Sequence, residues 1–160
     1  MRVEAPIKVD RKTKKLAKRL STGDIAVINH TDIDEVAANS LVECKIKLVI
    51  NAAPSISGRY PNKGPKILID NNILIIDNVG EKVFEDLKEG QIIEVNNGLI
   101  YRDGQLIGQG EVMDKSVVEQ KTKVAYENMS VELDRFIDNT IEYAKREKGF
   151  ILGETEIPKM

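Results

Sequence analysis

A loop rich in proline and glycine divides the first half of the chain. Residues 51–65 read NAAPSISGRYPNKGP, with three prolines and two glycines. This composition excludes a helix or a central strand, because proline lacks an amide donor and glycine permits positive φ. The apolar run Ile46–Ile50 precedes the loop. We therefore predict a long ordered loop at the carboxyl end of a strand, where α/β sheets place their ligand sites.

Strand-like and helix-like segments alternate on both sides of this loop. The order strand, helix, strand favours parallel pairing with right-handed crossovers. Asn96-Asn97-Gly98 between two apolar runs predicts a hairpin, and Arg102-Asp103-Gly104 predicts a second turn. The sequence therefore predicts an α/β domain with a mixed sheet over residues 21–113. Its expected strands are 25–28, 45–50, 73–76, 91–95, 99–101 and 105–112, and its expected helices are 33–43, 65–72 and 79–87.

Residues 114–149 predict one long helix. From Ser116 to Lys148 the chain has neither proline nor glycine, and apolar residues recur at three- and four-residue steps. At 1.5 Å per residue such a helix is about 50 Å long, whereas a compact core of this size is about 30 Å across. The apolar stripe therefore runs past the core. We expect a homodimer through residues 116–148, with the two helices antiparallel or crossing.

The charge distribution is uneven along the chain. The formal net charge is −2, but residues 1–20 carry eight basic and two acidic side chains, a net +6, which leaves −8 for the remainder. We predict a basic arm, with a short surface helix over Val9–Leu20. It either contacts nucleic acid or anionic lipid, or is a solvated helix or one docked on the acidic body of its own chain. The arm has no aromatic residue for base stacking, so we predict no nucleic-acid partner.

The cysteine content and the hydropathy of the chain indicate its cellular location. The single cysteine, Cys44, excludes an internal disulfide and a cysteine-based metal cluster. No apolar run reaches the ~18 to 20 residues that cross a bilayer. These features favour a cytoplasmic protein. We expect Gly149 to end the long helix and residues 150–160 to form a linker to a further domain.

Donor-bearing side chains concentrate in the central loop. Arg59 offers a bidentate fork to an anion, and hydroxyl groups and backbone N–H groups near Pro65 complete a cradle. We predict an anion-binding loop at residues 54–65 for a phosphate-bearing small ligand; the alternative is that Arg59 pairs with an acidic neighbour. The predicted ligand-binding residues are Asn51, Ser55, Ser57, Gly58, Arg59, Tyr60, Asn62 and Lys63.

Nothing in the loop predicts catalysis. It holds no histidine, cysteine or pair of carboxylates, and Asp77 at the end of the following strand supplies one carboxylate only. His30, the single histidine, is either a structural residue or a phosphoacceptor. We therefore predict no catalytic residue, metal or cofactor.

Residues 23–102 contain four segments in a recognisable order: GDIAV (23–27), VI (49–50), ILIID (73–77) and LKEGQIIEVNNGLIY (87–101). This layout is similar to the swivelling β/β/α domain of phosphoenolpyruvate-utilising enzymes. The resemblance implies that fold, together with a loop histidine that is phosphorylated. The histidine position falls here on Asn62 or Lys63, so the resemblance does not extend to that activity.

Four further segments form a pattern that covers nearly the whole chain: VDRKTKKLAKRL (9–20), GDIAVINHTDID (23–34), NAAPSISGRYPNKGP (51–65) and NTIEY (139–143). In these segments the chain resembles the N-terminal part of the SteA-like cytokinetic ring proteins of bacteria. In that family a thiamin-pyrophosphokinase-like domain and a C-terminal membrane helix follow. The resemblance implies a non-catalytic interaction or ligand-sensing domain in cell division, with a division or membrane protein as partner of the full-length protein. The alternative is the substrate-binding part of a thiamin pyrophosphokinase-related or phosphotransfer enzyme.

Overall fold

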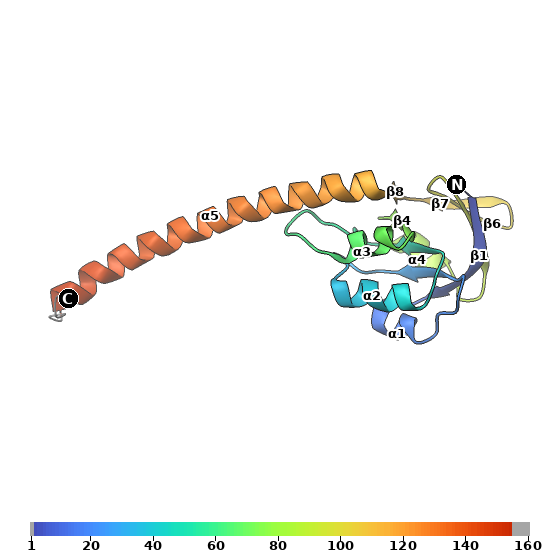
Figure 1. Ribbon diagram of the computed structural model, residues 1–160, viewed down its shortest axis with the longest axis horizontal. Helices are drawn as coiled ribbons and strands as arrows, with labels where there is room; N and C mark the ends of the chain where they lie inside the picture. Colours follow the sequence, from blue (N-terminus) through green and yellow to red (C-terminus); the bar gives the residue numbers. More distant parts are fainter. Residues whose placement is uncertain (1, 155–160) are drawn as a thin grey trace.

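An eight-stranded mixed sheet forms the body of the protein, and one long helix leaves it (Figure 1). The computed structural model describes the backbone of residues 2–154 and the side chains of residues 2–148. The strand order is β7-β6-β5-β1-β2-β3-β4-β8. The predicted fold class, an α/β domain with a mixed sheet followed by a long C-terminal helix, is confirmed. The elements are β1 Arg2–Val9, α1 Thr13–Ala17, β2 Ile25–Ile28, α2 Glu35–Glu43, β3 Leu48–Asn51, α3 Gly64–Asp70, β4 Leu74–Asp77, α4 Glu81–Asp86, β5 Ile92–Asn96, β6 Leu99–Arg102, β7 Gln105–Gln109, β8 Glu111–Met113 and α5 Lys115–Glu154.

The N-terminal residues belong to the sheet and do not form a separate arm. β1 pairs in parallel with β2 (Ile7 opposite Ile25) and antiparallel with β5 (Val3 opposite Val95). It therefore joins the parallel half of the sheet to the antiparallel half. The signal was the alternation of Val3, Ala5 and Ile7 with Glu4, Pro6 and Lys8, which has the two-residue period of a strand. The α/β domain thus begins at Arg2, and only Thr13–Ala17 of the expected N-terminal helix is helical.

Four of the eight basic side chains of this region, Arg2, Lys8, Arg11 and Arg19, pair with acidic residues of the same chain. Arg19 bonds Glu89 at 2.8 Å, and Lys8 bonds Asp24 at 2.8 Å. Arg11 forms an ion pair with Glu81 and lies over the ring of Phe84. The segment is therefore docked on the acidic body of its own chain through these four side chains.

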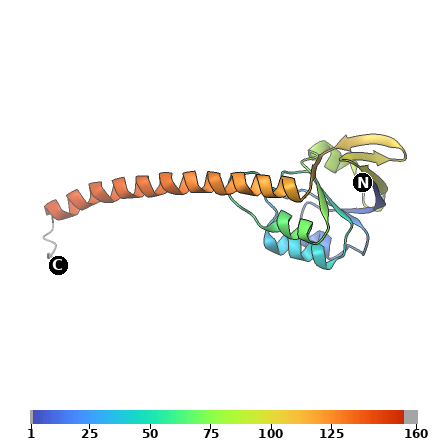
Figure 2. The ribbon, with the colours of Figure 1, turned by 45° about the horizontal axis from the view of Figure 1, so that its top comes forward.

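Two apolar layers enclose the sheet. On one face, α1, α2, α3 and α5 cover the parallel strands, as Figure 2 shows, with Leu16, Leu41, Leu68 and Val118 buried in one cluster. On the other face, α4 and the antiparallel strands β5 and β6 supply a second cluster that includes Phe84. The Gly110 amide donates to the Gly98 carbonyl at 2.9 Å, so the β5–β6 turn reaches the start of β8.

The predicted strand over residues 105–112 is divided into two. β7 pairs with β6, whereas β8 crosses to pair antiparallel with β4. Gly110 lies between them, where a Cβ would stand 2.6 Å from the Asp77 carbonyl oxygen. A residue without a side chain is therefore needed for the chain to cross beside β4.

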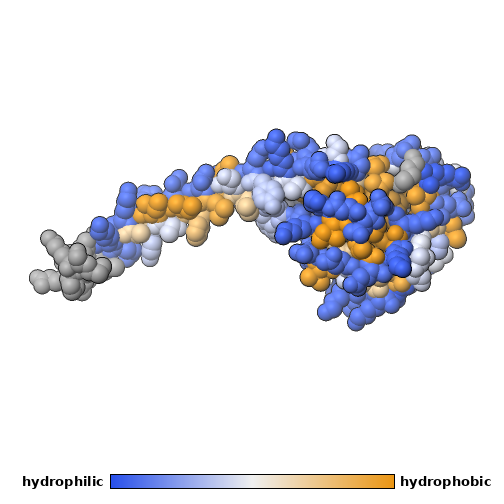
Figure 3. Space-filling model, in the orientation of Figure 1, coloured by the Kyte–Doolittle hydropathy of each residue, from blue (hydrophilic) through white to orange (hydrophobic). Residues whose placement is uncertain are grey.

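Helix α5 extends far beyond the domain. Its residues Val118 and Ala125 are buried against the domain, whereas every residue from Ser130 to Arg146 is exposed. Apolar side chains gather on the extended part (Figure 3). Gly149 does not end the helix, which continues to Glu154, because one glycine in a helix interior costs only about 1 kcal/mol relative to alanine. Of the expected linker, residues 150–154 are therefore helical and residues 155–160 lie outside the described part.

The described residues include no helix whose length and hydropathy together would let it cross a membrane.

Candidate functional site

The central loop leaves the carboxyl end of β3 and is fastened by a buried polar network. Asn51, the last residue of β3, is fully buried. Its Oδ1 accepts from the amides of His30 and Ala53, both at 3.1 Å. Its Nδ2 donates to the His30 carbonyl at 2.9 Å and to Ser55 Oγ at 2.7 Å. One amide side chain therefore ties the end of β2 to the start of the loop.

Asp77, at the end of β4, extends this network. Its Oδ1 accepts from the Ser55 amide at 3.0 Å and from Ser55 Oγ at 2.7 Å. The side chain is almost fully buried, and this burial raises the pKa of Asp77 above its usual range, although the two bonds from Ser55 act in the opposite direction. The side chains of Asn51, Ser55 and Asp77 thus link the carboxyl ends of β2, β3 and β4.

The middle of the loop is held by residues before α2. Asp32 accepts from the Ser57 amide at 2.7 Å and from Ser57 Oγ at 2.8 Å. Asn62 Nδ2 donates to the carbonyls of Ile33 and Ser55, both at 2.9 Å. Asn51, Ser55, Ser57 and Asn62, all predicted as ligand donors, therefore use their side-chain donors inside the protein.

Arg59, Tyr60 and Lys63 are exposed. Within the part of the chain that the structure describes, neither the Arg59 guanidinium nor the Lys63 ammonium has a hydrogen-bond or ion-pair partner. The alternative that Arg59 pairs with an acidic neighbour is thus not what the structure shows. Lys63 lies at the start of α3, three residues beyond Tyr60.

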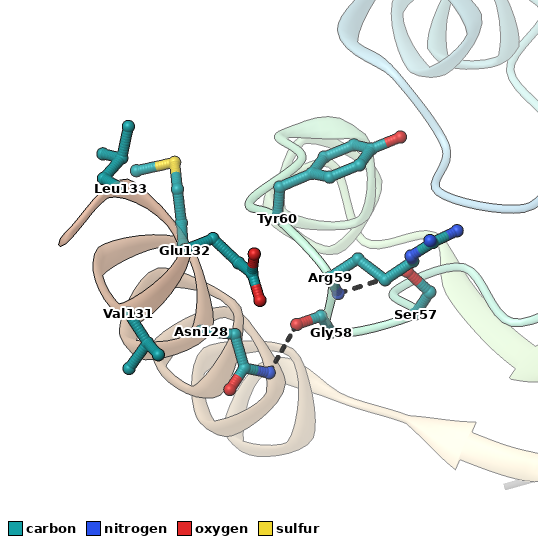
Figure 4. A pocket seen from close by; sticks show the side chains of 9 residues that line it. Ser57, Gly58, Arg59, Tyr60, Asn128, Val131, Glu132 and Leu133 are labelled. Atoms are coloured by element: carbon teal, nitrogen blue, oxygen red, sulfur yellow. Dashed lines mark hydrogen bonds between the residues drawn. The ribbon is translucent and has the colours of Figure 1, made fainter. Parts of the chain in front are cut away.

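Arg59 and Tyr60 line a cleft of about 800 Å³ between the loop and α5 (Figure 4). Gly58 adopts a φ of +89° at the turn, and its carbonyl accepts from Asn128 Nδ2 at 2.6 Å. The two residues are 70 positions apart in sequence, so this bond joins two distant segments and holds the loop against the helix. The lining residues are Ser57, Gly58, Arg59 and Tyr60 from the loop and Asn128, Met129, Val131, Glu132 and Leu133 from α5.

Sequence reasoning missed the contribution of α5 to this cleft. Asn128 and Glu132 are polar positions on a helix that is polar over most of its surface, so nothing in the sequence distinguishes them. Asp32 was also missed as the partner of Ser57. Its signal was weak: an aspartate just before a helix is an ordinary capping residue.

A second hollow of about 600 Å³ lies at the carboxyl ends of β1 and β2. His30 borders it, with Nδ1 and the Thr13 hydroxyl 2.9 Å apart. Lys12 and Lys14 also line it, as does Asp34, whose carboxylate accepts from the Ala37 amide at 2.7 Å. The charges of this hollow therefore have mixed signs, and its histidine is oriented by a buried hydroxyl.

Across residues 2–148, no group of three or more histidine, cysteine, aspartate or glutamate side chains is placed to hold a metal ion.

No protein-family model matches the chain, and no curated protein sequence matches it. Among solved structures, it is similar to the 3-isopropylmalate dehydratase (leuD) of Methanocaldococcus jannaschii, with a TM-score of 0.44 and 14% identity over 88% of this chain and 99% of that one. At this level, the similarity carries no argument about activity.

Proposed function

We propose that this chain is a ligand-binding and interaction module without catalytic activity of its own, and that it captures a phosphate-bearing small ligand beside Arg59. The observation that carries the proposal is the Arg59 guanidinium, which is exposed and has no protein partner among the described residues, on a loop that borders a cleft of about 800 Å³. A guanidinium binds phosphate oxygens through two parallel hydrogen bonds.

The rigidity of the loop supports this assignment. Ser55, Ser57 and Asn62 hold the backbone on both sides of Arg59 through bonds to Asp77, Asp32 and the Ile33 carbonyl. A ligand that binds a loop fixed in this way loses little free energy to ordering it. Asn51, Ser55, Ser57 and Asn62 thus position the loop. Arg59 and Tyr60 contact the ligand.

The wider role that we propose comes from the sequence resemblance. The chain would act in bacterial cell division, in the cytoplasm, as part of a longer SteA-like protein whose partner is a division or membrane protein. A homodimer through α5 belongs to the same proposal, because exposed apolar patches of this kind mark protein interfaces and a second copy would bury the apolar residues of that helix.

The test is an equilibrium titration of the purified chain with inorganic phosphate and with pyrophosphate, followed by calorimetry and by thermal shift. We expect saturable binding that weakens as salt concentration rises, since exposed charges are screened. A flat titration at millimolar pyrophosphate would refute the ligand site.

A phosphotransfer function is the second candidate, and His30 is the observation that favours it. Its ring borders a hollow that also holds Lys12 and Lys14. Incubation with radiolabelled phosphoenolpyruvate or ATP separates the two proposals. Stable labelling that disappears in the His30→Ala variant would establish phosphotransfer and exclude a purely binding role.

A further inference from the structure

A small cavity, separate from the cleft beside Arg59 and from the hollow beside His30, lies where the central loop meets the first turns of α5. In Figure 1 the start of α5 lies beside β4 and β8, and all three elements contribute to the cavity. Its volume is about 240 Å³, which is room for about eight water molecules. The lining residues are Pro54, Ile56, Asp77, Asn78, Glu111 and Lys121.

Two carboxylates of this cavity stand side by side. Asp77 and Glu111 are directly opposite one another in the antiparallel pairing of β4 with β8. Residues in this relationship project from the same face of the sheet, with their Cβ atoms about 5 Å apart. Like charges directly opposite one another repel and destabilise the pairing of the strands. A cationic group between the two carboxylates would remove this repulsion.

The chain supplies one cation for these two charges. Lys121 Nζ lies 3.1 Å from Glu111 Oε1, and both side chains are partly exposed. Asp77 is only 3% exposed, and its Oδ1 accepts both bonds from Ser55. Its second oxygen, Oδ2, has no hydrogen-bond or ion-pair partner among the described residues. The cavity therefore carries a net charge of −1, and one oxygen of its buried carboxylate is available to a ligand.

The electrostatics of Asp77 place the other two charges close to it. Burial raises the pKa of Asp77 most, and the bonds from Ser55 lower it. The Lys121 ammonium lowers the same pKa further, whereas the Glu111 carboxylate raises it. A buried carboxylate without a cationic partner is costly to the folded state. A ligand that brings a positive charge to Asp77 would therefore also stabilise the protein.

The donor set decides which cation fits. Two carboxylates beside an ammonium are a poor metal site, and no group of three metal-binding side chains occurs in the described part of the chain. A primary ammonium group has three N–H donors, enough to reach both Asp77 and Glu111. Lys121 has three such donors as well and uses one of them on Glu111, so it can also bind an anionic group of the ligand.

We propose that this cavity binds a small amino acid, with its ammonium group between Asp77 and Glu111 and its carboxylate on Lys121. The volume limits the ligand to about eight non-hydrogen atoms, as in glycine, alanine or serine. Because Asp77 also anchors the central loop through Ser55, the bound amino acid reinforces that anchor. This site is additional to the phosphate site beside Arg59 and does not depend on it.

Calorimetry and thermal shift with three small molecules test the ligand class. L-alanine carries both charged groups, ethylamine lacks the carboxylate, and propionate lacks the ammonium group. We expect L-alanine to bind saturably and to raise the melting temperature, since a ligand of the folded state stabilises it. Ethylamine should bind more weakly, and propionate should not bind. A response to propionate equal to that of L-alanine, or no response to L-alanine at tens of millimolar, would overturn the proposal.

Variants locate the binding. Asp77→Asn keeps an acceptor for Ser55 and removes the charge, so it should weaken L-alanine binding about tenfold or more, the effect of one charged hydrogen bond. Lys121→Gln should abolish the preference for L-alanine over ethylamine. Lys123→Gln, at an exposed lysine of α5 outside the cavity, is the matched control, and Arg59→Ala should bind L-alanine as the wild type does. Wild-type affinity in both Asp77→Asn and Lys121→Gln would overturn the site.

The titrations with phosphate and with L-alanine are independent. A protein that binds L-alanine and no phosphate would refute the proposed function and leave the amino-acid site standing. A protein that binds phosphate and no L-alanine would refute the amino-acid site alone.

Discussion

Ser55 donates twice to one oxygen of Asp77, from its hydroxyl at 2.7 Å and from its amide at 3.0 Å. This relationship fastens the start of the central loop to the end of β4, although the two residues are 22 positions apart. Both residues are buried. The loop that carries Arg59 is therefore anchored in the core of the domain.

Replacing Asp77 should separate the role of its charge from the role of its oxygens. Asp77→Asn keeps an acceptor for Ser55 and removes a buried charge, so we expect stability at pH 7 that is equal or higher. Asp77→Ala leaves the Ser55 amide and hydroxyl without their acceptor and should lose about 2 kcal/mol or more. Urea unfolding of both variants at pH 7 measures the difference. A larger loss for Asp77→Asn than for Asp77→Ala would contradict the assignment.

The pH dependence of the same pair follows from the raised pKa of Asp77, which burial causes. A carboxyl whose pKa is raised in the folded state binds its proton more tightly there than in the unfolded chain, so its charge opposes folding above that pKa. This destabilising contribution of the Asp77 charge to the folded state decreases as pH falls through the raised pKa, and it disappears below the ordinary pKa of 3.8. The stability gap between Asp77→Asn and wild type should therefore narrow as pH is lowered from 7 to 4. A gap that widens would show that the Ser55 bonds outweigh burial.

Asn51 should be among the most sensitive positions outside the apolar core. Asn51→Ala removes four hydrogen bonds from a fully buried side chain and leaves the His30 amide unpaired. We expect a loss of about 3 kcal/mol in the free energy of unfolding. Asn71→Ala is the control, since it removes one bond, to the Ile67 carbonyl, from an exposed residue and should cost less than about 1 kcal/mol.

Gly64 should tolerate no side chain, because a Cβ there would stand 2.1 Å from the Ile33 carbonyl oxygen. Gly64→Ala must displace the loop or the residues before α2, and we expect a loss of about 3 kcal/mol or more. Gly23→Ala is the comparison: its φ is +86° and no atom lies within 4 Å of the added carbon, so backbone strain alone should cost about 1 to 2 kcal/mol. Thermal unfolding of the two variants ranks them, and equal losses would refute the close approach.

Arg59→Ala should weaken phosphate binding and leave folding unchanged. The loss expected for one charged hydrogen-bonding group is about 1.5 to 3 kcal/mol of binding free energy. The melting temperature should stay within about one degree, because the guanidinium has no partner among the described residues. Lys82→Ala, at an exposed lysine outside the cleft, is the matched control. A large loss of stability with binding intact would make Arg59 a structural residue.

Local sequence spacing determined most of the elements. The β-branched runs, the Asn97-Gly98 turn and the long stretch without proline or glycine each act through backbone preference, and the structure confirms the strands, hairpin and helix that they predict. The position of the central loop at the end of β3 follows from the same patterns. These features depend on residues that are close together in the sequence. Hydrophobic periodicity and turn residues predict structure over that short separation.

Tertiary structure decided the rest, because the deciding partners are distant in the chain. The charge excess of residues 1–20 concealed the alternation that makes Arg2–Val9 a strand between β2 and β5, and the acidic residues that pair with it lie as far away as Glu89. Ser55 and Ser57 could be recognised as internal donors only once Asp77 and Asp32 were beside them. The loop that carries Arg59 borders a cleft because α5 passes beside it and Asn128, 70 positions after Gly58, bonds the Gly58 carbonyl. Composition shows that a loop carries donors, but which donors remain for a ligand depends on the acceptors that the fold brings to them.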